Sequence, residues 1–119
     1  MRERMRATLD KSGGGRFDLK QGPGGIADVE FMVQYSVLRW AADYPDLADW
    51  TDNIRILETL GRHALLPGAA AEELTQAYKA LRAVYHRNAL RGTPGLVPDA
   101  QLQSEQARVA AIWQELMES

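Results

Sequence analysis

Apolar residues recur at intervals of three and four along most of this 119-residue chain, which is the spacing of one face of an α-helix. No segment alternates apolar and polar residues with period two for long enough to predict a strand. We therefore expect an all-α fold, a helical bundle of about five helices with short loops. The expected helices cover about residues 2–9, 25–43, 51 to the Leu-Leu-Pro-Gly at 65–68, 67 or 68 to 91, and 99–117.

Glycine and proline mark the expected ends of these helices. Tyr44 precedes Pro45 and should end the first long helix, because the residue before a proline is pushed out of the α region. Asp49 or Thr51 is the expected cap of the next helix. Residues 91–98, Arg-Gly-Thr-Pro-Gly-Leu-Val-Pro, form the clearest loop. We expect residues 1–14 to be the end of a preceding helix with a glycine-rich linker, and residues 15–119 to form a C-terminal helical domain.

Composition excludes several classes of protein. The chain has a formal net charge of −2 and no cysteine, so neither a disulfide framework nor thiolate chemistry is expected. No apolar run approaches the ~20 residues of a membrane helix, and no secretory signal is present. Charge alternates in blocks, with two basic and seven acidic groups in residues 21–60 and five basic and two acidic in 61–91. This pattern is not the basic stripe of a nucleic-acid binder. We expect a cytoplasmic protein that binds neither nucleic acid nor membrane.

The Gly-Pro-Gly-Gly before the first long helix is the most distinctive short segment. Gly24 and Gly25 would leave the first backbone N–H groups of the helix uncovered, and such an end attracts anions. Lys20 lies upstream and would add a positive charge. Asp28 and Glu30 lie about 200° apart around the helix, so they cannot chelate one ion together. Helix-start acids and turn-forming glycines are the simpler interpretation, and the residues alone favour it.

The remaining polar residues do not form a catalytic set. His63 and His86 are the only histidines, and neither has a second ligand at metal-binding spacing, so no metal site is predicted. Lys79, Arg82 and His86 follow one another at helical spacing and give one helix a basic face. That face is either exposed to solvent or binds an acidic partner. We therefore predict no catalytic residues within this chain.

Three segments carry a resemblance to a known family. FDLKQGPGGIADVEFMVQY, WTDNIRILETL and AYKALRAVYHRNAL resemble, in the same order, the helical domain that follows a nucleotidyltransferase domain in bacterial glutamine synthetase adenylyltransferases. The GG-I-x-D-[IV]-E-F string is the most specific element, and the resemblance covers about residues 15–117. The end of the chain is similar to the extreme C-terminus of that family. This implies the helical domain attached to the second, adenylylating half.

The resemblance implies a function for the parent enzyme. Members of the family transfer AMP from ATP to a tyrosine of glutamine synthetase and remove it again, under the control of glutamine and the PII signalling protein. ATP and Mg²⁺ belong to a G-S-x-x-x-x-D-x-D site in the upstream nucleotidyltransferase domain. That string is absent here, so we expect this chain alone to be inactive and to bind neither. The implied partners are the upstream domain, glutamine synthetase and PII.

The resemblance also implies roles for particular residues. The segment in which glycines precede the first long helix should lie where the helical domain meets the catalytic domain, and it should help to form the nucleotide cleft. Its candidate residues are Lys20, Gly24, Gly25, Asp28 and Glu30. Residues of the other two segments should form a structural polar network between helices; its candidates are Asn53, Arg55, Arg82 and His86. Two alternatives remain open: the equivalent domain of a PII uridylyltransferase, and a non-catalytic docking module for PII or glutamine synthetase.

Overall fold

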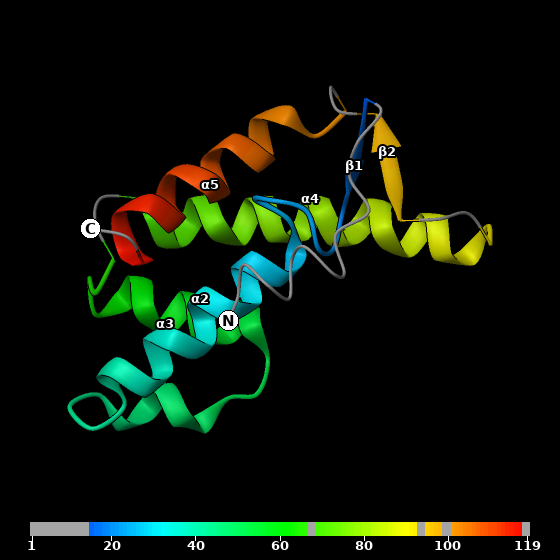
Figure 1. Cartoon of the computed structure of the whole chain (residues 1–119). Coiled ribbons are helices and arrows are strands. Elements are labelled where there is room, and N and C mark those ends of the chain that lie inside the picture. Colours follow the sequence, from blue (N-terminus) through cyan, green and yellow to red (C-terminus); the bar gives the residue numbers. More distant parts are fainter. Residues whose placement is uncertain (1–14, 67–68, 93–94, 99–100, 118–119) are drawn as a thin grey trace.

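The computed structural model describes residues 15–66, 69–92, 95–98 and 101–117. Most of them are helical (Figure 1). The predicted helix at residues 2–9 and the predicted linker lie outside the described residues. In chain order the elements are β1 (Arg16–Asp18), α2 (Ile26–Trp40), the 3₁₀ helix η1 (Pro45–Asp49), α3 (Asn53–Arg62), α4 (Ala70–Leu90), β2 (Leu96–Pro98) and α5 (Gln103–Met117).

A helical bundle was predicted, and helices dominate the described residues, but the fold is not purely helical. β1 and β2 pair antiparallel, with Phe17 opposite Val97. The prediction of no strands is therefore wrong, and part of the predicted loop at 91–98 is a strand. Three-residue strands are too short to display period-two alternation, and the partners lie far apart in sequence. Four α-helices are seen in the described ranges, rather than about five.

The helices begin and end close to the predicted positions, with local corrections. α2 ends at Trp40 instead of near residue 43, and Pro45 opens a 3₁₀ helix instead of a plain loop. The cap of α3 is Asp52, whose carboxylate accepts a hydrogen bond from the Ile54 N–H at 2.9 Å. Asp49, Thr51 and Asp52 can all cap a helix and lie close together in the sequence. The sequence pattern does not distinguish them, and the predicted cap was wrong.

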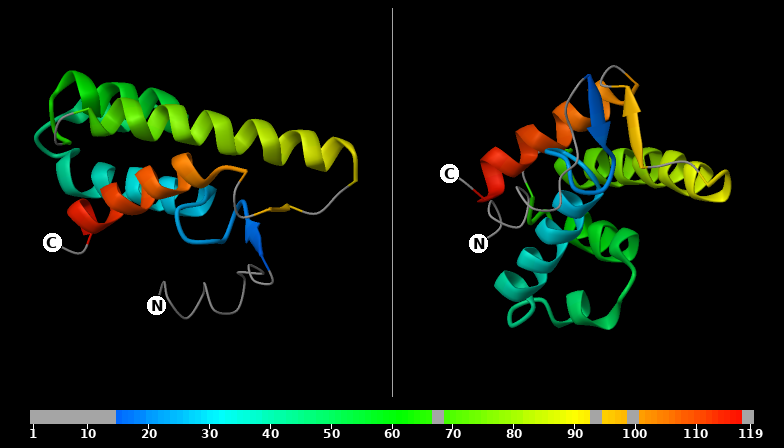
Figure 2. Two further views of the ribbon diagram at one scale, coloured as in Figure 1. Left: turned by 90° about the horizontal axis from the view of Figure 1, so that it is seen from above. Right: turned by 45° about the vertical axis from the view of Figure 1, so that its right-hand side comes forward.

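The core surrounds α4, which packs against α3, α5 and α2. The second half of α4 extends past the other helices (Figure 2). Most periodic apolar positions of the helices are buried, because helices of this length are stabilised mainly by packing one apolar face. Leu38 of α2 is an exception, with 86% exposure. Side chains with at most 1% exposure include Val29, Val33, Leu57, Leu60, Leu74, Leu81 and Val109.

Candidate functional site

The turn between β1 and α2 is organised by Asp18. Its buried carboxylate accepts hydrogen bonds from the backbone N–H groups of Lys20 at 3.0 Å and Gln21 at 3.1 Å. The Gly22 N–H donates to the Asp18 carbonyl at 2.9 Å. The sequence analysis did not single out Asp18, although an aspartate just before a glycine-proline turn is the usual signal for such a side-chain-capped turn.

The glycines are required because this turn is packed tightly. Gly24 has a φ of +78°, and a Cβ at this position would lie 2.4 Å from the carbonyl oxygen of Gln106 in α5. A Cβ on Gly25 would lie 2.6 Å from the carbonyl oxygen of Leu19. Both distances are far below a van der Waals contact. The glycine pair therefore lets the start of α2 approach α5 and the end of β1.

The backbone donors at this helix start are already engaged. The Gly24 N–H donates to the Asp28 carboxylate at 2.8 Å, and the Gly25 N–H donates to the Gly22 carbonyl at 2.9 Å. The Ile26 and Ala27 N–H groups donate to carbonyls of the preceding turn, at 2.9 Å each. The expected uncovered donors are therefore not found at residues 24–27. A position at a domain junction stays a prediction for this segment.

Asp28 and Glu30 have separate surroundings, as their angular separation requires. Asp28 is buried at the start of α2. Glu30 is half-buried and faces the junction of α2, α3 and α4, where one carboxylate oxygen accepts a hydrogen bond from the Tyr78 hydroxyl at 3.0 Å. The two acids therefore act in different places, one inside the turn and one between helices.

The Tyr78 hydroxyl is the centre of a polar network between three helices. It accepts hydrogen bonds from Asn53 Nδ2 and from Arg82 Nη1, each at 3.1 Å, and donates to Glu30. A hydroxyl has one donor and two acceptor positions, so this one is saturated. The Tyr78 hydrogen bond and the negative charge of Glu30 both raise the pKa of Arg82 above its ordinary value. The network therefore fixes a cation on α4 next to an acid on α2.

The other two network candidates lie nearby but do not contact Tyr78 in the described structure. The Arg55 guanidinium lies over the Trp50 ring, 5.5 Å from its centroid. His86 lies beside Arg82 in a groove along α4. The structure thus brings Asn53 and Arg82 together through Tyr78, which the sequence analysis did not select as a member of the network. It also adds Glu30 to the same network.

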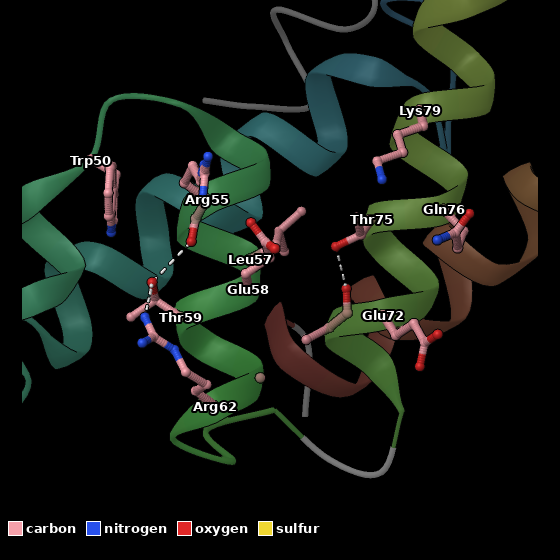
Figure 3. Close-up of a pocket in the computed structure, with 12 residues that line it drawn as sticks. Trp50, Arg55, Leu57, Glu58, Thr59, Arg62, Glu72, Thr75, Gln76 and Lys79 are labelled. Atoms are coloured by element: carbon pink, nitrogen blue, oxygen red, sulfur yellow. Dashed lines mark hydrogen bonds between the residues drawn. The ribbon is translucent and has the colours of Figure 1, made fainter.

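Two grooves flank this network. The larger, about 670 Å³, lies between α3 and α4 (Figure 3) and carries both signs of charge, with three cations and two carboxylates. Its threonines bond back to their own helices: Thr59 to the Arg55 carbonyl and Thr75 to the Ala71 carbonyl. The smaller groove, about 430 Å³, has no acidic lining residue; its lining is Ile54, Tyr78, Lys79, Arg82, Ala83, His86, Arg87 and Leu90.

Within the described ranges, no cluster of three or more histidine, aspartate or glutamate side chains could hold a metal ion. The Mg²⁺ that the resemblance implies belongs to the upstream domain of the parent enzyme and stays a prediction. A search of the same residues for a helix long and apolar enough to cross a membrane finds none.

A separate polar pair joins η1 to the end of α3. His63 Nε2 lies 3.0 Å and 2.8 Å from the two carboxylate oxygens of Asp46, and the His63 and Tyr44 rings pack at a tilt of 44° with their centroids 4.7 Å apart. An ionised carboxylate only accepts, so Nε2 must carry the hydrogen. This hydrogen bond from His63 holds the pKa of Asp46 below its ordinary value.

We expect this pair to make stability depend on acid pH. A depressed pKa means that ionised Asp46 stabilises the fold above about pH 4, and that this contribution is lost as the pH falls through the folded-state pKa. Melting temperatures from about pH 5 to pH 2.5 should therefore fall more steeply for the natural chain than for Asp46→Asn. Asp43→Asn removes a nearby exposed carboxyl and is the control. Parallel curves for the natural chain and Asp46→Asn would contradict the prediction.

Comparison with known proteins agrees with the resemblance. Residues 1–115 match the family model described as GlnD PII-uridylyltransferase. The chain is 48% identical to a protein of Shewanella loihica and 47% identical to one of Nitrosococcus oceani, over 98% and 99% of its length. It is 49% identical to a protein of Pseudomonas putida over 84% of its length. All three are named bifunctional glutamine synthetase adenylyltransferase/adenylyl-removing enzyme. The chain spans about an eighth of the length of the first two and 10% of the third.

Proposed function

Because the chain belongs to the family described as GlnD PII-uridylyltransferase, we propose that it is the helical domain of a bifunctional glutamine synthetase adenylyltransferase and adenylyl-removing enzyme. The observation that carries this proposal is the 47–48% identity to enzymes of that name over 98% or more of the chain. In the whole enzyme, a cytoplasmic nucleotidyltransferase domain would hold ATP and Mg²⁺ and transfer AMP to glutamine synthetase. PII would act as a regulatory partner.

The role proposed for this domain is to pack on the nucleotidyltransferase domain through the start of α2. Lys20, which is exposed, would lie at that junction together with Gly24, Gly25, Asp28 and Glu30. Further along α2, Phe31 is 46% exposed and Leu38 is 86% exposed. Residues seven apart lie on the same face of a helix, two turns from each other. This apolar face of α2 supports the proposal because exposed apolar patches mark surfaces that another domain or protein covers.

The first test separates catalysis from folding in the full-length enzyme that carries this domain. Glu30→Gln keeps an acceptor oxygen for Tyr78 and removes only the charge that acts on the exposed Arg82, so we expect a stability loss below about 1 kcal/mol. If Glu30 orients catalytic-domain groups, the adenylylation rate should fall at least 100-fold, about 2.7 kcal/mol of transition-state stabilisation. Rate and melting temperature are measured together.

Asp28→Asn is the matched comparison. The Asp28 carboxylate accepts a charge-assisted hydrogen bond inside the turn, so we expect its replacement by an amide to cost about 1–2 kcal/mol of stability. The adenylylation rate should follow only the loss of folded protein. An unchanged rate in Glu30→Gln would leave Glu30 with a purely structural role at the three-helix junction.

A second candidate function is the equivalent domain of a PII uridylyltransferase. The description of the matched family model favours it, whereas the relatives named above favour the adenylyltransferase. The two are distinguished by giving the full-length protein ATP with glutamine synthetase, or UTP with PII, and measuring which protein is labelled. A third candidate, a docking module with no role at the nucleotide site, would be opposed by micromolar Mg-ATP binding to the isolated chain.

A further inference from the structure

An exposed stripe runs along the outer side of α4. Its members, which we call the α4 stripe, are Lys79, Arg82, Ala83, His86, Arg87 and Leu90. They recur at intervals that place them on one side of the helix. The opposite side carries Leu81 and Val84, which are buried in the core. The stripe is therefore the solvent-facing side of the central helix.

The α4 stripe carries unneutralised positive charge. Three of its six residues, Lys79, Arg82 and Arg87, are cations at neutral pH, and α4 contains no acidic residue after Glu73. The carboxylates of Glu30 and Asp52 act on Arg82, and Lys79 also lines the larger groove, which contains Glu58 and Glu72. Among the described residues, Lys79 and Arg87 form no ion pair. These cations are free to meet an external acidic group.

The shape of the stripe suits a protein surface. It begins at the smaller groove, where Ile54 and Tyr78 contribute to the lining, and it ends at Leu90, which is 80% exposed. From Lys79 to Leu90 it spans roughly 16 Å, at 1.5 Å per residue. The half of α4 that carries its end extends past the other helices (Figure 2). A partner can approach this end without meeting the rest of the domain.

We propose that the α4 stripe is a docking surface for the protein substrate, glutamine synthetase, and binds an acidic patch with an apolar contact at Leu90. This inference rests on the proposed function. A protein substrate must bind and leave in every cycle, and complementary charge gives fast association without excessive affinity. The apolar face of α2 suits permanent packing on the catalytic domain better. The α4 stripe would therefore bind the substrate, and the apolar face of α2 would bind the neighbouring domain.

The test uses the full-length enzyme and the substitution Arg87→Glu, with Arg108→Glu as the matched control. Both arginines are exposed on helices, and neither belongs to the Tyr78 network. At low salt we expect Arg87→Glu to raise the KM for glutamine synthetase about tenfold, with kcat and the KM for ATP unchanged. The double variant Lys79→Glu/Arg87→Glu should raise it further. The effect should shrink in high salt, because exposed charges are screened. Arg108→Glu should change none of these values.

Several results would overturn the inference. An unchanged KM for glutamine synthetase in both stripe variants would mean that the stripe does not dock it. A raised KM for ATP would assign the stripe to the nucleotide instead, and an equal effect of Arg108→Glu would show a general charge effect. Equal melting temperatures of all variants exclude unfolding as the cause. If the unaltered enzyme transfers no AMP to glutamine synthetase, the proposed function fails and this inference fails with it.

Discussion

Replacing Gly24 with alanine is expected to lower the free energy of unfolding by about 3 kcal/mol. The backbone at Gly24 has a φ of +78°, a conformation that costs an L-residue roughly 1–2 kcal/mol. The added Cβ would also lie 2.4 Å from the Gln106 carbonyl oxygen. This contact is with backbone, so either α5 or the turn must shift, and overpacking of this kind costs about 1–3 kcal/mol. Urea denaturation of the 119-residue chain measures the change.

Gly92→Ala is the matched control for this prediction. Gly92 has a similar φ of +69°, but an added Cβ there meets no atom within 4 Å. Its substitution should cost only the backbone term, about 1 kcal/mol. The difference between the two variants isolates the crowding against α5. Equal losses would show that the turn moves away from α5 without cost.

The glycine turn also shows which parts of the fold the sequence can predict. Val29 and Val33 repeat at helical spacing, so the helix itself was visible. The reason for Gly24 was not, because it depends on a carbonyl oxygen about 80 residues further along the chain. The same limit hid the sheet, in which Phe17 pairs with Val97. Periodicity reports the local structure of a segment, whereas close approach between distant segments leaves no periodic signal.

The same limit of sequence periodicity applies to the candidate site. Glu30, Asn53 and Arg82 were selected from their motifs as members of two separate groups. Their common partner Tyr78 fitted the apolar face of α4, and its ring is indeed 3% exposed. A tyrosine has an apolar ring and a polar end, and helical spacing predicts only the burial of the ring. Which groups meet the hydroxyl depends on how three helices pack, and that information is not local.

Truncating the centre of this network is expected to have the largest effect of all. Tyr78→Ala removes a buried aromatic ring from α4 and leaves a cavity between helices, at a cost of about 4 kcal/mol. It also leaves the Glu30 carboxylate and the Asn53 amide without their shared partner. A domain of this kind has only about 5–15 kcal/mol of stability in total. We therefore expect a large fall in the urea midpoint of the 119-residue chain.

Tyr78→Phe separates the ring from the hydroxyl. The ring stays packed, and the three groups that it loses are only partly buried or exposed, so water can replace part of what the hydroxyl provided. The expected cost is therefore only about 1 kcal/mol. In the full-length enzyme, the same change should reduce the adenylylation rate if the network holds Glu30 in place, and combining it with Glu30→Gln should add little further loss. A Tyr78→Phe cost as large as that of Tyr78→Ala would instead make the hydroxyl network, and not the packed ring, the main support of the three-helix junction.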